Sequence, residues 1–161
     1  MRQAALWLAC MALAGCGFHL RVEQPFAFDR LYLSGADTSP VVNDLRRVLA
    51  TRKGLILTDA ATGAQATLQI VSDAKEKIIL SLTGAGLVRE YQLRQRVSYI
   101  LADPRHPDNA SPGEISVNRT LLYSDTEILA KQSEETLLYR DMETDVVQQI
   151  LRRMAAFKPA S

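Results

Sequence analysis

Two long stretches in the middle of the chain alternate between apolar and polar residues, which is the pattern of half-buried β-strands. In residues 66–82 the alternation is regular at both ends and weaker in the middle, so we expect one strand with a bend or bulge near Ala74. Residues 87–102 alternate most clearly, and Gln95 interrupts their apolar face. The glycines in residues 83–86 predict a hairpin turn between these strands, because glycine adopts positive φ without steric cost.

Shorter apolar segments lie on both sides of this hairpin. Residues 30–33 and 55–57 each suit a short strand, and residues 115–123 alternate again and are expected to form the last strand. Residues 103–113 contain three prolines, which lack a backbone donor and have a fixed φ. This segment is therefore predicted to be a surface loop.

Two other segments carry apolar residues at helical spacing. The first is expected to begin with Ser39 as its N-cap and Pro40 in its first turn, and to end before Gly54. The second is expected to begin with Ser133 as its N-cap and to reach Phe157. The apolar stripe of this last helix consists of Leu138, Met142, Val146, Ile150 and Met154.

A sheet with one apolar face and one charged face requires helices on its apolar side. The sequence therefore predicts an α+β fold of the α/β sandwich type. In this fold the two helices pack on the apolar face of the sheet. Residues 30–157 are expected to form a single domain, and residues 158–161 a C-terminal tail.

The N-terminal residues have the pattern of a bacterial lipoprotein signal. Arg2 precedes the apolar run 4–14, which is too short to span a bilayer, and small residues then precede Cys16. We expect residues 1–15 to be a signal peptide and the Cys16 thiol to carry a diacylglycerol. Residues 16–29 lack periodicity and are expected to form a lipidated tether. The alternatives are an ordinary signal peptide with a chance cysteine, or a buried helix.

The residue after the lipidated cysteine indicates the destination of the protein. It is Gly17, and not the aspartate that usually retains a lipoprotein at the inner membrane. Two or more acyl chains are needed for firm anchoring. We therefore expect the protein to be held at the outer membrane by its lipid.

The charge and cysteine content of the mature chain argue against a nucleic-acid partner and against a disulfide. One of the 19 basic residues, Arg2, lies in the signal peptide, which leaves 18 basic against 18 acidic residues. A chain without a basic excess is not expected to bind nucleic acid. Cys16 is the one cysteine that remains after cleavage, so the fold must be stable without a disulfide.

The sequence contains no arrangement of residues typical of an enzyme. The mature histidines, His19 and His106, lie in the tether and in the proline-rich segment, away from any motif that pairs them with a nucleophile. No zinc or phosphate-loop motif occurs. The carboxylates of the last helix lie at surface positions. We therefore expect neither catalysis nor a metal.

A set of basic residues is the candidate functional surface. Arg89, Arg94 and Arg96 lie along the second hairpin strand, and Lys131 lies just before the last helix. Guanidinium and ammonium groups bind phosphate, and lipopolysaccharide (LPS) is the abundant phosphorylated partner at the outer membrane. The alternative is a solvated sheet face, or surface ion pairs with residues such as Glu90 and Glu134.

Five short stretches occur in an order and spacing typical of one lipoprotein family. They are residues 14–21 (AGCGFHLR), 90–93 (EYQL), 129–131 (LAK), 138–142 (LYRDM) and 149–153 (QILRR). On these residues the chain resembles the LPS-assembly lipoprotein family, LptE. The resemblance implies an α/β sandwich in which two helices pack on one face of a four-stranded, mostly antiparallel mixed sheet. It also implies no catalytic residues, and no cofactor other than the covalent N-acyl and S-diacylglycerol lipid on Cys16.

The resemblance further implies a role in LPS transport. Family members plug the lumen of the LPS-transport β-barrel, LptD, help it assemble and bind LPS. The expected location is the outer membrane, lipid-anchored, facing the periplasm and inside the barrel lumen. The LAK match carries one LPS-binding residue onto Lys131. The second falls in the hairpin loop 84–88, which lacks a basic residue here, and Arg89 is expected to replace it. The alternative function is a periplasm-facing lipoprotein that binds another ligand or protein.

Overall fold

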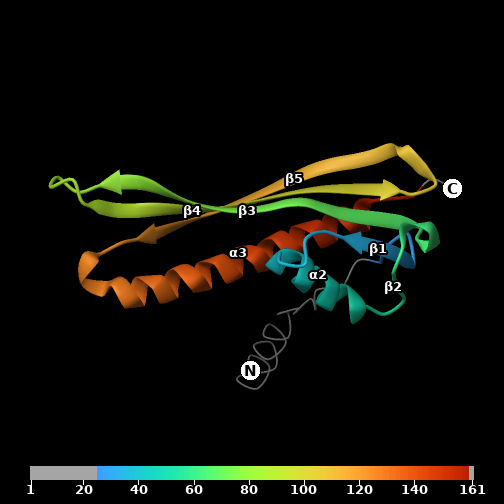
Figure 1. Ribbon diagram of the computed structural model, residues 1–161, viewed down its shortest axis with the longest axis horizontal. Helices are drawn as coiled ribbons and strands as arrows, with labels where there is room; N and C mark the ends of the chain where they lie inside the picture. Colours follow the sequence, from blue (N-terminus) through green and yellow to red (C-terminus); the bar gives the residue numbers. More distant parts are fainter. Residues whose placement is uncertain (1–24, 160–161) are drawn as a thin grey trace, which may run out of the picture.

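The computed structural model describes residues 25–159 and shows a mixed sheet covered on one face by two helices (Figure 1). The strands are β1 (Arg30–Ser34), β2 (Ile56–Thr58), β3 (Ala66–Leu82), β4 (Val88–Asp103) and β5 (His106–Leu122). The helices are α2 (Pro40–Ala50) and α3 (Ile128–Ala156).

The strand order in the sheet is β2-β1-β3-β4-β5. β1 runs parallel to both of its neighbours, while β3, β4 and β5 form an antiparallel meander. This confirms the predicted α+β sandwich. The sheet has five strands and not four, because the three residues of β2 pair with β1 as an additional edge strand.

α2 begins as the sequence predicts. The Ser39 hydroxyl accepts a hydrogen bond from the Val42 N–H at 3.2 Å, and Pro40 occupies the first turn. The same hydroxyl donates to the Asp73 carboxylate of β3 at 2.6 Å, so the helix cap also joins the helix to the sheet. The face of α2 that packs inward consists of Val41, Val42, Leu45 and Leu49.

The hydrophobic core occupies only part of the length of the molecule. All the buried residues of α3 lie in its second part, from Met142 to Met154. They pack against buried β4 and β5 residues such as Leu93 and Leu121. The first part of α3 lies below the extended β3–β4 hairpin in Figure 1, away from this core. We call this region the distal end: residues 77–92, the end of β5, and α3 up to residue 137.

The prediction for the start of α3 was wrong. The helix begins at Ile128, five residues before the predicted N-cap Ser133. A short 3₁₀ turn, Asp125–Glu127, leads into it. The Ser133 hydroxyl donates to the Leu129 carbonyl at 3.1 Å, a backbone contact that lets serine lie inside a helix.

The predicted loop 103–113 is also mostly strand. β5 begins at His106, and Pro104 and Arg105 alone form the turn that joins it to β4. Pro107 and Pro112 are tolerated because β5 is an edge strand, where a missing backbone donor does not break a pairing on both sides.

The bulge in β3 lies at Val71 and not near Ala74. Ala74 pairs regularly with Arg96, whereas the register shifts between Ile70 and Ser72, and again between residues 79 and 82. A one-residue shift reverses which side chains face the helices. Before Val71 the even-numbered residues of β3 face the core and the helices. After Val71 the odd-numbered residues face that side. The inward face of β3 therefore becomes charged towards the distal end.

Candidate functional site

Two of the four basic residues predicted to bind phosphate lie on the sheet face opposite the helices. Arg94 contacts Glu76 at 3.4 Å and donates to the Asn118 side chain at 3.2 Å. Arg96 lies 3.7 Å from the Glu114 carboxylate. Both guanidinium groups thus have carboxylate neighbours on the outer face, which supports the alternative of surface ion pairs for these positions.

The other two, Arg89 and Lys131, lie at the distal end. The Arg89 carbonyl accepts a hydrogen bond from the Tyr123 N–H at 2.9 Å, which ties the start of β4 to the segment that leads into α3. Lys131 lies in the first turn of α3, and its ammonium contacts Glu134 at 2.9 Å. Its side chain is only 17% exposed, whereas Arg89 is exposed. The structure therefore separates the predicted set into two pairs on different surfaces.

The distal end also exposes a group of large apolar side chains. Nine of the eleven exposed large apolar residues in the described part of the chain lie here. They are Ile78, Ile79, Leu80, Leu82, Leu87, Leu122, Ile128, Leu129 and Leu137. Leu129 alone is 80% exposed. Exposed apolar side chains gathered at one end indicate a binding surface and not a random scatter.

Polar contacts join α3 to the sheet between residues 135 and 143. The Lys75 ammonium lies 2.5 Å from the Glu143 carboxylate, and the Lys77 ammonium lies 2.6 Å from that of Glu135. The Tyr139 hydroxyl donates to the backbone carbonyl of residue 76 at 3.1 Å. Burial, and then the nearby Glu135 charge, raise the pKa of Tyr139. Between residues 135 and 143, α3 is thus held to the sheet by ion pairs and a tyrosine hydroxyl.

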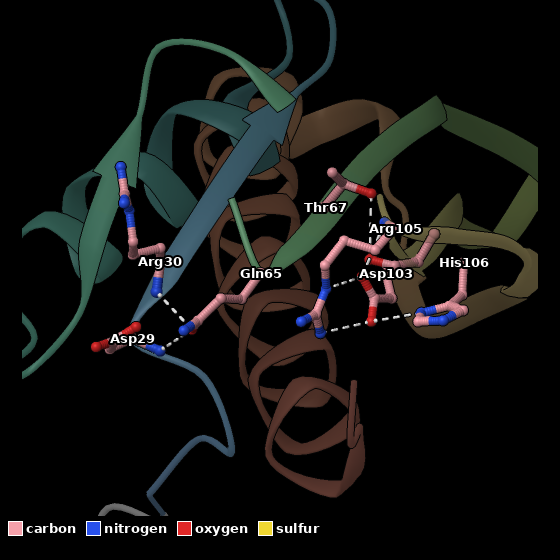
Figure 2. Close-up of polar contacts among 8 residues, drawn as sticks. Asp29, Arg30, Gln65, Thr67, Asp103, Arg105 and His106 are labelled. Carbon is pink, nitrogen blue, oxygen red and sulfur yellow. Dashed lines mark hydrogen bonds and ion pairs between the residues drawn. The ribbon is translucent and has the colours of Figure 1, made fainter. Parts of the chain in front are cut away.

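A second polar cluster closes the β4–β5 turn at the opposite end of the sheet (Figure 2). The Asp103 carboxylate, which is 1% exposed, accepts hydrogen bonds from the Arg105 side chain at 2.9 and 3.1 Å. His106 Nδ1 lies 3.4 Å from the same carboxylate. The hydrogen bonds from Arg105 hold the pKa of Asp103 well below its usual range. Figure 2 also shows the Gln65 side chain, which accepts hydrogen bonds from the backbone N–H groups of Asp29 and Arg30, where β1 begins.

This cluster predicts how stability depends on pH. Because the pKa of Asp103 is lower in the folded than in the unfolded chain, the carboxylate stabilises the fold above about pH 4 and ceases to do so as the pH falls towards the folded-state pKa. We expect Asp103→Asn to be less stable than wild type at neutral pH, and to lose less stability between about pH 5 and pH 2. Urea unfolding across this range measures the difference.

The exposed Asp108 on β5 provides the matched control. Asp108→Asn is expected to keep the wild-type dependence of stability on pH. A wild-type pH profile in the Asp103→Asn variant would show that the hydrogen-bonded carboxylate does not contribute to stability.

Two further observations bear on the chemistry of the described residues. Between residues 25 and 159 no group of three or more histidine, cysteine, aspartate or glutamate side chains is arranged to hold a metal. None of the helices in that range is long and apolar enough to cross a membrane. Cys16, the expected lipidation site, the signal peptide and most of the tether lie outside the described residues.

Comparison with known proteins assigns the chain to a family. The family model LptE, described as lipopolysaccharide-assembly, matches residues 28–154, which include all five strands and nearly all of α3. The chain belongs to the LptE family. LptE-family proteins are lipoproteins of LPS assembly, and they are neither enzymes nor cofactor-dependent.

Individual relatives agree with this assignment. The LPS-assembly lipoprotein LptE of Yersinia pestis (strain Pestoides F) is 29% identical over 152 residues, which cover 92% of this chain and 72% of the relative. The solution structure of lipoprotein B from Nitrosomonas europaea is 40% identical, with a TM-score of 0.74 over 88% of this chain and 92% of that one. The crystal structure of rare lipoprotein B from Shewanella oneidensis is 29% identical, with a TM-score of 0.70 over 80% of this chain and 95% of that one.

Proposed function

We propose that this LptE-family lipoprotein is anchored in the outer membrane through acyl chains on Cys16, plugs the lumen of the LPS-transport barrel LptD, and binds LPS during its delivery to the cell surface. The observation that carries the proposal is the kind of side chains that the distal end exposes. There, exposed apolar side chains and two cations, Arg89 and Lys131, lie at the same end of the molecule. LPS presents the matching chemistry, because phosphate groups lie beside acyl chains in its lipid A portion.

The outer face of the sheet supports the role of a plug. Between Gln92 and Ser98 its β4 side chains are polar or charged, and Arg94 and Arg96 lie beside carboxylates. The lumen of an outer-membrane barrel is lined by polar side chains and water. A polar face of this kind can lie against the lumen without burying unpaired charge.

Binding of a phosphate to Lys131 requires a change in its ion pair. The Lys131 ammonium already contacts Glu134, and its side chain is mostly covered. A phosphate carries more charge than a carboxylate and has more acceptor oxygens, so it can replace Glu134 at the ammonium. Glu134 therefore competes with the ligand.

Glu134→Gln is expected to raise the affinity for LPS by about twofold to fivefold, because it removes a competing carboxylate worth roughly 0.5–1 kcal/mol. Titration of the mature protein with purified LPS measures the change. Glu114→Gln removes the carboxylate beside Arg96 on the outer face and should leave the affinity unchanged. Unchanged or weaker binding by Glu134→Gln would contradict a phosphate contact at Lys131.

A further inference from the structure

The register shift at Val71 turns two lysines of β3 towards α3, and the two make the same kinds of contact. Lys75 pairs with Glu143 and lies 5.1 Å from the ring centroid of Tyr139. Lys77 pairs with Glu135 and lies 4.3 Å from the ring centroid of Tyr91. Each ammonium thus contacts one glutamate of α3 and the face of one tyrosine ring. The two lysine side chains are 35% and 33% exposed.

The surroundings of the two lysines differ. The partner of Lys75, Glu143, is 11% exposed and follows the first buried residue of α3, so this pair lies at the edge of the core. The partner of Lys77, Glu135, is 23% exposed. The next inward-facing residue of β3 beyond Lys77 is Ile79, which is 55% exposed. Lys77 therefore belongs to the distal end, and Lys75 does not.

Lys77 and Lys131 both lie where α3 faces the sheet. Lys131 precedes Glu135 by four residues, and residues at this spacing lie on one face of a helix. Because Glu135 contacts Lys77, Lys131 lies one helical turn closer to the N-terminus of α3, on the same side of the helix. Arg89 lies at the same end, joined by its carbonyl to Tyr123.

The tyrosine rings hold the Lys77 ammonium in place. The ring centroid of Tyr123 lies 5.9 Å from it, in addition to that of Tyr91, and the two rings contact each other edge to face. An ammonium over aromatic faces is attracted to them whether or not a carboxylate is present. A ligand that replaces Glu135 therefore meets a cation that is already positioned, which lowers the entropic cost of binding.

We propose that Lys77 is a further phosphate contact of the distal end, and that Glu135 is the counter-ion that a phosphorylated amphiphile displaces from it. This inference rests on the proposed function, because it assumes that the distal end binds LPS. Lys77 supplies a basic contact on β3 that the loop 84–88 lacks. Loss of the Lys77–Glu135 pair on binding also removes one of the contacts that hold the first turns of α3 to the sheet.

The test compares Lys77→Gln with the matched variant Lys75→Gln. The mature proteins are titrated with bisphosphorylated lipid A and with dephosphorylated lipid A, and circular dichroism checks that both variants fold. Lys77→Gln should bind bisphosphorylated lipid A about twofold to fivefold more weakly than wild type, while Lys75→Gln should bind it as wild type does. Both variants should bind dephosphorylated lipid A as wild type does.

A second variant tests the counter-ion separately. Glu135→Gln keeps Lys77 and removes its competitor, so it should bind bisphosphorylated lipid A about twofold to fivefold more tightly. The inference is overturned if Lys77→Gln binds as wild type does, if Lys75→Gln loses as much affinity as Lys77→Gln, or if Glu135→Gln does not bind more tightly.

Failure of the proposed function gives a different result. In that case wild type itself would not bind bisphosphorylated lipid A, or reversal of the charges at Arg89 and Lys131 would leave its binding intact. Suppose instead that wild type binds and that these reversals weaken its binding. Wild-type affinity in Lys77→Gln would then refute the role of Lys77 and leave the proposed function standing.

Discussion

Reversal of both distal cations, Arg89→Glu together with Lys131→Glu, should weaken LPS binding by about tenfold to a hundredfold. A partly exposed ion pair contributes up to about 1 kcal/mol, so the two lost contacts amount to roughly 1–2 kcal/mol, and each 1.4 kcal/mol is a factor of ten in affinity. The new carboxylates would also repel the phosphates of the ligand. Titration of the mature protein with purified LPS at one fixed salt concentration measures the loss.

The control is Arg94→Glu together with Arg96→Glu, which makes the same change of charge on the outer face of the sheet. We expect it to leave LPS affinity unchanged, because these residues lie on the opposite face of the sheet from α3, beside Glu76 and Glu114. A loss of affinity in this variant, with normal binding by the distal variant, would place the LPS site on the outer face.

Leu93→Ala should produce the largest loss of stability of the variants considered. Leu93 is fully buried on β4 and packs into the core that α3 covers. Truncation of such a leucine removes its transfer free energy and leaves a cavity, which together lower the free energy of unfolding by about 2–5 kcal/mol. Urea unfolding followed by circular dichroism measures this difference.

Leu129→Ala is the matched control, because it removes the same atoms from a leucine that is 80% exposed in the first turn of α3. Its free energy of unfolding should change by no more than about 0.5 kcal/mol. Equal losses in the two variants would mean that the distal end is packed as firmly as the core, contrary to the burial observed.

Much of the fold could be predicted from local patterns. The alternation in residues 87–102 predicts β4, and Ser39 with Pro40 predicts the start of α2, because short-range backbone chemistry decides both. The start of β5 could not be predicted in this way. Pro107 and Pro112 argue against a strand unless it is known to lie at an edge of the sheet, and that depends on tertiary arrangement.

The site was predictable only in part, for a related reason. The basic residues were identified from residue type and a family match, but their partners depend on the register of the sheet. A single extra residue at Val71 moves Lys75 and Lys77 to the helix-facing side, and the sequence shows this only as weakened alternation. The apolar run 78–80 predicts a strand but does not predict its exposure, because the length of sheet that the core covers is not a local property.

We propose that this LptE-family protein acts as a subunit of the LPS-transport barrel. The most direct test is to tag the mature protein, extract it from its own outer membrane in mild detergent and identify what copurifies with it. We predict a stable complex with one large β-barrel protein, LptD, in stoichiometric amount. Recovery of the protein alone, or in a stable complex with a different partner, would contradict the account.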